Sequence, residues 1–409
     1  MDNTAKAISV VLTEQQNQAI DMVYRLFADG SRMAHIKGSA GTGKTTLVKE
    51  LAKASQFGKV ILAAPTHKAA KVLQAKTGRM VRTIHSLMGM TIVDVEDRQE
   101  LVQSKAVKFK NNTLLVIDEA SMISAELMGI VQGVVNSFPR MRVLFIGDPY
   151  QLNPIGESPS TAFNTAGVEL TQIMRQQQGS PIIELAQFIR TAVNLNINDL
   201  RQFHNGDTII VGQNRQDWLN NTVSASRTAI AWRNSRVAEI NAAARFKLFG
   251  EESRVRPYMV GETVITYAPL MLNKTTLLEN SAEVVITGVV PCQWRGFSAY
   301  QITCQEAKFY AVHDPVELDE YLKRAAAKAK ALPSPQRGIC FRTEFFAVRD
   351  SFLDIRPSHA MTSHKSQGST FAHVAVDAND IFINRTIDER VRSLYVAVSR
   401  ASESVSILI

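Results

Sequence analysis

Residues 38–45 read Gly38-Ser39-Ala40-Gly41-Thr42-Gly43-Lys44-Thr45, and the rest of the chain can be placed around them. A short apolar run at residues 33–36 predicts a buried strand before this stretch, and residues 46–51 favour a helix after it. Glycine at the first and sixth positions permits a tight turn whose backbone N–H groups point toward a phosphate. The positive end of the helix dipole lies behind the same turn. A chance glycine-rich turn is not expected between a strand and a helix, so the stretch predicts a nucleoside triphosphate site.

Each position of this loop has an expected task. Lys44 is predicted to reach the β- and γ-phosphates, and Thr45 is predicted to place its hydroxyl on Mg²⁺. The remaining nucleotide-binding positions follow from the same motif: Gly38, Ser39, Ala40, Gly41, Thr42, Gly43 and Thr46. A nucleoside triphosphate and Mg²⁺ are therefore the expected ligands.

The composition is that of an ordinary globular protein. The chain has 409 residues, 45% of them apolar and 21% charged, which suits two to four domains. Lys and Arg number 46 against 38 Asp and Glu, and the resulting net charge of +8 is a weak indication of a polyanionic partner. No apolar run approaches the roughly 18 residues of a membrane span, and no signal-peptide pattern is visible. The 3 cysteines form no Cys-x-x-Cys pair, so we expect no zinc site, no disulfide framework and a reducing setting.

Two carboxylates and an amide follow predicted strands further along the chain. An apolar run at residues 113–117 ends at Asp118 and Glu119. After a phosphate loop, Asp118 is expected to bind Mg²⁺ directly or through water, and Glu119 to polarise an attacking water. Two acids that merely cap the next helix are the alternative, which the upstream loop disfavours. Gln151 follows the next strand, residues 142–146, and is expected to orient the water or sense the γ-phosphate.

Gln16 has two possible roles, and the sequence does not decide between them. Thr13 and Gln16 have the spacing of a capping box at the start of a predicted helix. The amide of Gln16 can equally read the edge of an adenine base. The two roles are compatible with one another.

Two further segments are candidates for contact with a phosphodiester backbone. Residues 65–70 and 82–86 place hydroxyls, imidazoles and cations just after predicted strands or short helices. The candidate residues are Pro65, Thr66, His67, Lys68, Thr83 and His85. A threonine or histidine in a loop is more often a helix cap or a turn residue, and this reading also stands.

The middle of the chain follows a different pattern. Residues 90–112 are polar and β-rich, and they predict a hairpin inserted into the first core. Short alternating strands at residues 259–355 predict a small β-barrel, interrupted by a basic helix that begins at Asp314. The lysines of that helix are most simply a solvated face. The α/β pattern then returns, with Tyr395 expected in the core and Arg400 able simply to complement a helix dipole.

Together these segments resemble superfamily-one helicases of the RecD/Dda branch. The resemblance runs from Gln16 to Arg400 in the order of the family's motifs. The phosphate loop and the acid pair alone mark only a P-loop NTPase. The more specific segments are residues 64–70, 147–152, 363–370 and 395–401. Ser366-Gln367-Gly368 stands where the UvrD/Rep branch typically has Ala-Lys-Gly, which favours the RecD/Dda branch, and the small size is similar to that of its phage members.

The resemblance implies an α/β fold with two RecA-like P-loop cores, each built on a parallel sheet, and ATP in the cleft between them. The first core is expected at residues 1–155, with residues 90–112 as a strand-separating pin. The second core is expected at residues 156–258 and 356–409. Residues 259–355 would form a small SH3-like β-barrel between the two parts of the second core.

Roles for individual residues follow from the same resemblance. Gln16 would contact adenine, and Gly368 would contribute to the nucleotide site. The catalytic set would comprise Lys44, Glu119 and Gln151 from the first core, with Arg175 and Arg400 as arginine fingers from the second core. Thr362, His364 and Lys365 would hold nucleic acid from the second core. Phe341, Phe345, Phe346 and Phe352 stand where phage relatives have a Trp-rich stretch, so a base-stacking role is not transferred to them.

The activity that the resemblance implies is ATP-dependent DNA unwinding by a helicase that moves 5′ to 3′ along single-stranded DNA. A translocase that displaces bound proteins without processive unwinding, an RNA helicase, and a strand-binding module without ATPase activity are the alternatives. The expected partners are single-stranded DNA, forked duplex DNA, and a single-strand-binding, replication or recombination protein. A monomer in the cytoplasm of a phage-infected bacterial cell, with no membrane association, is expected.

Overall fold

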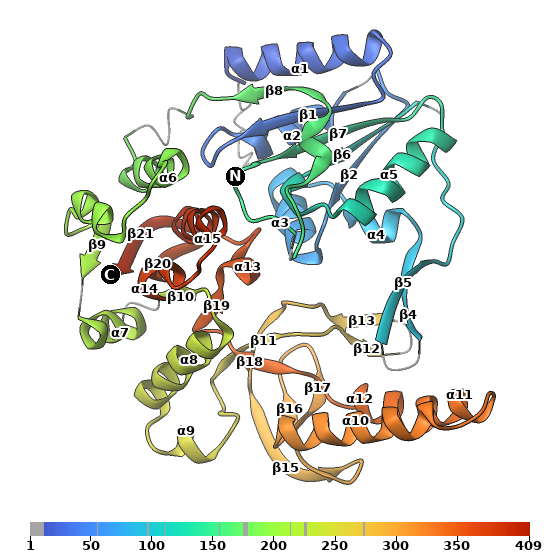
Figure 1. The fold of residues 1–409 in the computed structure, drawn as a ribbon, viewed down its shortest axis with the longest axis vertical. Helices are drawn as coiled ribbons and strands as arrows, with labels where there is room; N and C mark the ends of the chain where they lie inside the picture. Colours follow the sequence, from blue (N-terminus) through green and yellow to red (C-terminus); the bar gives the residue numbers. More distant parts are fainter. Residues whose placement is uncertain are drawn as a thin grey trace, which may run out of the picture.

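The computed structural model describes residues 12–54, 56–95, 98–110, 112–154, 156–174, 179–212, 214–224, 227–272 and 275–409. In these ranges the strands form two parallel sheets and several smaller antiparallel sheets (Figure 1). None of the helices in the same ranges has the length and apolar character needed to cross a membrane.

The first sheet contains the strand that precedes the phosphate loop. Its described strands run in the order β3-β2-β6-β7-β1-β8, and every pairing is parallel. The strands are β1 (Met33–Gly38), β2 (Lys59–Ala64), β3 (Val81–Thr83), β6 (Thr113–Ile117), β7 (Arg142–Gly147) and β8 (Ala166–Leu170). Alternate residues of β6 enter two different apolar cores, because successive side chains of a strand point to opposite faces.

Helices cover both faces of this sheet. They are α1 (Glu14–Ala28), α2 (Lys44–Leu51), α3 (His67–Thr77), α4 (Ile84–Leu87) and α5 (Ala125–Ser137). Apolar residues of α1, α2 and α3 share one core, whereas those of α4 and α5 share the other. The carboxyl ends of the parallel strands therefore meet at one edge of a sheet that is buried on both sides.

Strand β8 corrects the boundary that was expected at residue 155. Residues 34–38 of β1 pair with residues 166–170 of β8, so the first sheet extends into the range assigned to the second core. β8 lies at the sheet edge and only Leu170 in it is fully buried, so it lacks the apolar run that marks a buried strand in a sequence. The remaining domain boundaries stay predictions.

The second sheet is also parallel, in the order β19-β10-β20-β21-β9. Its strands are β9 (Ile209–Gly212), β10 (Thr228–Ala231), β19 (Ala360–Thr362), β20 (Phe371–Asp377) and β21 (Ala401–Leu408). The helices around it are α6 (Pro181–Thr191), α7 (Arg215–Ser224), α8 (Asn234–Phe249), α13 (Ser363–Ser366), α14 (Ala378–Phe382) and α15 (Ile387–Ser399). The two parallel sheets confirm the predicted α/β class.

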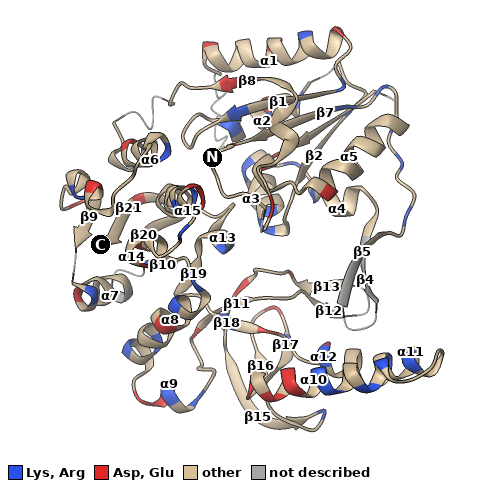
Figure 2. Ribbon diagram, viewed as in Figure 1, with Lys and Arg blue, Asp and Glu red and all other residues tan. Residues whose placement is uncertain are grey.

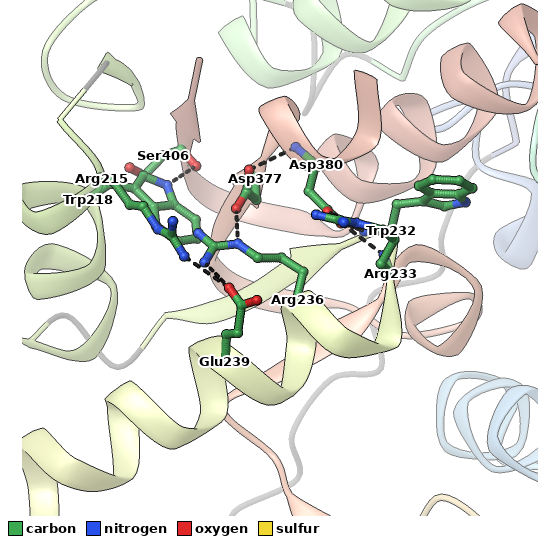
Figure 3. Close-up of polar contacts among 9 residues, drawn as sticks. All are labelled: Arg215, Trp218, Trp232, Arg233, Arg236, Glu239, Asp377, Asp380 and Ser406. Carbon is green, nitrogen blue, oxygen red and sulfur yellow. Dashed lines mark hydrogen bonds and ion pairs between the residues drawn. The ribbon is translucent and has the colours of Figure 1, made fainter. Parts of the chain in front are cut away.

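Ion pairs to two buried carboxylates connect the two parts of the chain that build this second sheet (Figure 3). Arg236 Nε lies 2.6 Å from Asp377 Oδ2, and Arg233 Nε lies 2.6 Å from Asp380 Oδ1. Both carboxylates are 2% exposed, so each needs a cationic partner to offset its desolvation. The pairs join the start of α8 to the end of β20 and to α14, across the inserted residues between them.

The hairpin expected in the first core is present. β4 (Met90–Val95) and β5 (Arg98–Gln103) are antiparallel neighbours. Gly89 closes the base of the hairpin, because its carbonyl oxygen accepts the N–H groups of Ser104 and Lys105 at 3.0 and 3.2 Å. The hairpin ends before residue 112, since Val107 and Phe109 already pack against the first core.

The insertion in the second core is β-rich and carries a helical arm. Its sheets have the orders β14-β11-β18, β12-β13 and β15-β16-β17. The strands are β11 (Thr263–Thr266), β12 (Leu270–Leu272), β13 (Thr275–Leu278), β14 (Glu283–Val285), β15 (Gly288–Trp294), β16 (Phe297–Thr303), β17 (Lys308–Val312) and β18 (Ile355–Pro357). The strands pair in separate sheets, so closure into an SH3-like barrel stays a prediction.

The helical arm consists of α10 (Pro315–Lys330), α11 (Gln336–Cys340), a π-helix (Phe341–Phe346) and α12 (Ala347–Arg349). Asp314 begins α10 as predicted, because its side chain accepts the Val316 N–H at 2.8 Å. Phe341 and Phe345 are buried against alanines of α10. These two rings belong to the arm's own core, which agrees with not giving them a base-stacking role.

Candidate functional site

The phosphate loop lies between β1 and α2. Gly41 and Gly43 have φ angles of +83° and +76°, in the left-handed region that glycine adopts without strain. A Cβ atom at Gly38 would lie 2.7 Å from Thr42 Oγ1, so the first glycine is needed for space. Thr42 Oγ1 donates to Ser39 O at 2.9 Å and closes the loop. The loop therefore presents its backbone at the N-terminus of α2, where an anion is favoured.

Lys44 lies folded over this loop. Its Nζ donates to Gly38 O and Ser39 O at 2.7 and 2.8 Å. A phosphate oxygen would be a stronger acceptor than a neutral carbonyl, because the bond would then join two charges. Thr45 follows Lys44 in α2 and lines the adjoining cavity.

Asp118 and Glu119 end β6 beside the loop. Burial, reinforced by the Glu119 carboxylate, raises the pKa of Asp118 to about 7, and the Lys44 ammonium opposes this rise. Glu119 has a φ of +53°, an uncommon conformation for a residue with a Cβ. Its Oε2 is buried and has no hydrogen-bond partner among the described residues. Glu119 therefore combines an unfavourable backbone conformation with a buried oxygen that has no partner among the described residues, and it lies next to Asp118, whose pKa is raised. This combination suits a site that binds a cation and a water.

A single cavity joins these acids to the second sheet. Its walls are formed by Thr45, Ala69, Val72, Leu73, Lys76, Asp118 and Glu119 from the first sheet's side, and by Gly368, Ser369, Thr370 and Arg400 from the other side. Arg400 is 7% exposed, and its guanidinium donates to Val396 O, Ser369 O and Ser399 Oγ. The structure thus brings one predicted arginine finger to the predicted metal ligands.

The second predicted finger, Arg175, lies outside the described residues. Met174 is the nearest described neighbour, and its N–H donates to Gly41 O at 3.0 Å. The Met174 sulfur also accepts from Gln16 Nε2 at 3.5 Å. The chain therefore touches the phosphate loop one residue before Arg175.

Gln16 forms the capping box that its spacing predicted. Its N–H donates to Thr13 Oγ1 at 3.2 Å, and its Oε1 accepts the Thr13 N–H at 2.9 Å. The Nε2 group donates to Thr42 O at 3.2 Å, which anchors α1 to the phosphate loop. The structural reading of Gln16 is confirmed, and contact with adenine stays a prediction.

Gln151 lies just beyond β7, and its backbone is held by the second core. Its side-chain Oε1 is buried without a hydrogen-bond partner among the described residues. Its backbone oxygen accepts from Arg392 Nη1 at 2.9 Å, and the same guanidinium group donates to Pro149 O. Gln367 Nε2 donates to Leu152 O at 3.2 Å. Two residues of the second core therefore hold the segment that carries Gln151.

Tyr395 makes the most central contact between the cores. It is 1% exposed, and its hydroxyl donates to the fully buried Asp148 carboxylate. The same hydroxyl oxygen accepts the N–H of Ala40 in the phosphate loop at 3.1 Å. Burial and the Asp148 carboxylate raise the pKa of Tyr395, so the phenol stays protonated.

Sequence reasoning placed Tyr395 in the core and missed this contact. The signal available was that a buried tyrosine hydroxyl needs a hydrogen-bond partner. Arg392 and Asp148 were also missed, because neither residue type nor spacing identifies a partner on another core. All three residues connect α15 to the carboxyl edge of the first sheet.

The predicted nucleic-acid contacts divide into helix caps and charged groups. Thr66, Thr83 and Thr362 each accept the N–H of the residue three positions on, so all three are N-caps. The interpretation as local caps is thus confirmed for Thr66 and Thr83, and Thr362 is a cap as well. Pro65 is buried at the end of β2.

Two lysines of this set come from different cores, and the charge of Lys68 acts on Lys365. Burial lowers the pKa of Lys68, and its Nζ has no hydrogen-bond partner among the described residues. Burial, assisted by the Lys68 charge, lowers the pKa of Lys365 to about 8. Two cations from different cores, one of them without a hydrogen-bond partner among the described residues, are suited to bind an anion.

The three histidines of the set differ in surroundings. His67 Nδ1 lies 2.6 Å from Glu279 Oε2. Burial lowers the pKa of His85 and that of His364, so both favour the neutral form. Among these three, His67 is the one that forms an ion pair in the described part of the chain, whereas Glu126 and Glu389 act only electrostatically on His85 and His364.

Comparison with known proteins identifies relatives of both halves. The family described as AAA domain matches residues 11–213, and the UvrD-like helicase C-terminal domain matches residues 357–408. The chain is 29% identical over 283 residues to the ATP-dependent DNA helicase dda of Enterobacteria phage T4, covering 63% of this chain and 62% of that protein. It is 34% identical over 180 residues to the ATP-dependent RecD2 DNA helicase of Deinococcus radiodurans, covering 43% of this chain and 23% of that protein. The matched regions span less than two thirds of either helicase.

Solved structures share the fold. Bacteroides Pif1 bound to single-stranded DNA has a TM-score of 0.55 at 18% identity, with 97% of this chain and 92% of that chain covered. Pif1 helicase from Candida albicans has a TM-score of 0.52 at 16% identity, with 98% of this chain and 94% of that chain covered.

Proposed function

This chain belongs to the Pif1/RecD/Dda-like helicases of superfamily one, and we propose that it uses ATP to move along single-stranded DNA and to unwind a duplex ahead of it. The observation that carries this proposal is the cavity in which Thr45, Asp118 and Glu119 of the first core meet Arg400 of the second. A ligand held there contacts both cores, so its binding and release can change how the cores are placed.

The residues around the cavity fit Mg²⁺ and a triphosphate. Mg²⁺ prefers oxygen ligands and is usually bound by one or two carboxylates together with substrate phosphates. Asp118 and Thr45 would supply such oxygens, although no group of three or more His, Cys, Asp or Glu side chains converges among the described residues. Bound Mg²⁺ would neutralise phosphate charge, and Gln16 would contact the adenine.

The chain's own groups would then divide the work of hydrolysis. Lys44 would bind the phosphates together with the loop backbone and Thr46, while Glu119 and Gln151 would position the attacking water. Arg400 would neutralise charge that develops on the γ-phosphoryl group, because a guanidinium can bind two oxygens at once. Arg175 would be a second finger from the same side.

The strand would cross the edge where both cores present cations. His67 and Lys68 would hold phosphates from the first core, with His85 nearby, and His364 and Lys365 would do so from the second core. The hairpin β4–β5 would act as the pin at the fork. Melting one base-pair step costs on the order of 1.4 kcal/mol, so each closure of the cleft must bias the fork by at least that amount.

We also propose that the protein moves 5′ to 3′ along single-stranded DNA, as its resemblance to the RecD/Dda branch implies. We further propose that the protein acts as a monomer inside the cell on forked DNA. It would act there together with a single-strand-binding, replication or recombination protein. Unwinding of paired substrates with opposite single-stranded tails, in DNA and RNA versions, tests polarity and substrate together. Displacement of a bound protein without strand separation would favour the translocase instead.

The first test of the site itself is Lys44→Ala. The variant should lose DNA-stimulated ATP hydrolysis, because the phosphates lose their cation, and it should still bind a fluorescent single strand within about twofold of the wild type. Hydrolysis rates and fluorescence anisotropy on the same preparation measure both. A Lys44→Ala protein that still unwinds duplex DNA would contradict the proposed site.

A further inference from the structure

One loop of the insertion contacts the cations that a strand would need. Residues 279–282 connect β13 to β14, and together with Glu283, the first residue of β14, they reach the first core at the start of α3. Glu279 Oε2 lies 2.6 Å from His67 Nδ1, and the Glu279 side chain is only 28% exposed. We call residues 279–283 the acidic loop.

The same loop also reaches Lys68 and Lys365. Asn280 Oδ1 accepts from Lys365 Nζ at 3.3 Å. The Glu283 carboxylate acts electrostatically on Lys68 and opposes the lowering of that lysine's pKa by burial. His67 of the first core and Lys365 of the second are therefore both in contact with this one short loop, and the Glu283 carboxylate acts electrostatically on Lys68.

A groove separates the acidic loop from α3. One wall carries His67, Lys68 and Lys71, whereas the other carries Glu279, Glu283 and Glu306. The walls are of opposite charge, so they attract one another across the groove. A phosphodiester strand would be attracted to the first wall and repelled by the second.

We propose that the acidic loop is a gate over the strand-binding groove, in which Glu279 and Asn280 hold His67 and Lys365, and Glu283 shares the groove with Lys68, until the phosphates of a single strand take their place. The exchange is chemically matched, since carboxylate and phosphate oxygens both accept from ammonium and imidazolium groups. Lys68 supports this reading, because its buried Nζ has no hydrogen-bond partner among the described residues while Glu283 is its electrostatic neighbour. This inference rests on the proposed function, since it assumes that His67, Lys68 and Lys365 bind a strand.

If the acidic loop is a gate, its substitution should change the affinity for single-stranded DNA in the opposite direction from substitution of a residue that binds the strand. Removing the loop's charge should strengthen binding, because the strand no longer competes with the protein's own carboxylates. The double variant Glu279→Gln/Glu283→Gln should bind a fluorescein-labelled oligothymidylate about three- to tenfold more tightly than the wild type at low salt, as expected for the loss of two partly exposed charge interactions. The gain should shrink as salt rises, because salt screens the competing pairs in the wild type.

Glu317→Gln is the matched control. Glu317 is an exposed residue of the first turn of α10, and its substitution changes the net charge by the same unit as each single gate variant. Equilibrium anisotropy over a salt series and stopped-flow association rates should be measured for wild type, both single variants, the double variant and the control. The association rate constant should rise in the gate variants and stay within about 1.5-fold of wild type in Glu317→Gln.

The outcomes separate the gate from the proposed function. Tight, salt-dependent binding by the wild type with gate variants no tighter than Glu317→Gln would overturn the gate and leave the proposed function standing. Failure of the wild type and every variant to bind the oligothymidylate would overturn both. Weaker binding by Glu279→Gln would also overturn the gate, because it would make the loop a positive contact for the strand.

Discussion

Arg400 is the residue that brings the second core to the acids of the first. Its guanidinium is held by Val396 O, Ser369 O and Ser399 Oγ, so it is already oriented within the cavity. We expect Arg400→Ala to lower kcat by about 10³-fold, the lower end of the range for arginine fingers. The affinity for nucleotide should change by less than about threefold, because Lys44 and the phosphate loop remain.

Steady-state hydrolysis and titration with a fluorescent nucleotide separate these two effects. Arg390→Ala is the matched control, because Arg390 lies on the same helix and donates to Asn384 O instead. Equal losses of kcat and affinity in Arg400→Ala would argue against the finger role and for a general binding contact.

We expect Lys365 to give strand binding a pH dependence. Burial and the neighbouring Lys68 charge lower the pKa of Lys365 to about 8, so this ammonium is charged below that pH and neutral above it. Affinity for single-stranded DNA should therefore fall by about two- to fivefold between pH 7 and pH 9.5, because one charged contact is lost. Anisotropy titrations across this range measure the fall.

Lys365→Arg tests the assignment, because a guanidinium stays charged throughout the range. The variant should bind at pH 7 within about threefold of the wild type and should lose the step near pH 8. A step of unchanged size in Lys365→Arg would assign the titration to another group.

At the scale of elements, we expect that the hairpin β4–β5 can be removed while Met90, Val107 and Phe109 keep their packing against the first core. Met90 pairs with Gln103 at its base, whereas Val107 and Phe109 further on pack against the first core. Replacing residues 91–102 with Asn-Gly keeps the pair at the base and supplies a two-residue turn. We expect DNA-stimulated hydrolysis within about twofold of the wild type and a loss of at least about tenfold in unwinding of a fork.

Hydrolysis on single-stranded DNA and strand separation on a fork should be measured on the same protein. The matched control replaces residues 96–97 alone with Asn-Gly, which keeps both strands. Unwinding that survives removal of the hairpin would show that another element separates the strands, and loss of hydrolysis would show that the hairpin contributes to the motor itself.

The elements differ in how far the sequence reveals them. Buried strands such as β6, with every residue covered, and capped helices such as α3 and α10 follow from apolar runs and cap residues. Edge strand β8 was assigned to the wrong core, because a strand with one partner and one buried residue has little local pattern. The pairing of short strands in the insertion is set by long-range contacts, so an SH3-like barrel is not decided by composition.

The same division holds for the site. The loop at Gly38–Thr45, Asp118 and Glu119 follow from motif spacing, and Arg400 is placed as the family resemblance implies. The contacts of Tyr395 and Glu279 do not follow from the sequence, because the residue that each one contacts lies more than 200 residues away in the chain. Contacts between cores depend on the placement of whole sheets, which no local pattern records.

At the scale of the whole molecule, α15 provides several of the contacts that hold the two cores together. Tyr395 is hydrogen-bonded to Asp148 and Ala40, and Arg392 is hydrogen-bonded to Pro149 and Gln151. Helix α15 itself lies beside α13 (Figure 1). Arg400 follows at the end of the same helix. A shift of α15 relative to the first core would therefore move the finger, the contact to the phosphate loop and the contact near Gln151 together. We expect this coupling to transmit closure of the cleft from one core to the other.

Tyr395→Phe tests whether that coupling matters for turnover. The ring and its packing remain, but Asp148 loses a hydroxyl donor and the Ala40 N–H loses its acceptor. A hydrogen bond to a charged group is worth about 1.5–3 kcal/mol, so we expect kcat to fall by about tenfold or more if the bond supports the closed cleft. Nucleotide affinity should change by less than about threefold, because the phosphate loop itself is intact.

The control and a second substitution decide between coupling and simple loss of stability. Tyr258→Phe removes another tyrosine hydroxyl, one that donates to Val312 O at 3.2 Å within the insertion, and should leave kcat unchanged. Asp148→Ala should lower kcat to a similar extent as Tyr395→Phe, and the double variant should be no worse than either, because both remove the same bond. Additive losses in the double variant would mean that Tyr395 and Asp148 act separately, and the two cores would then have to communicate through Arg392 and Gln367 instead.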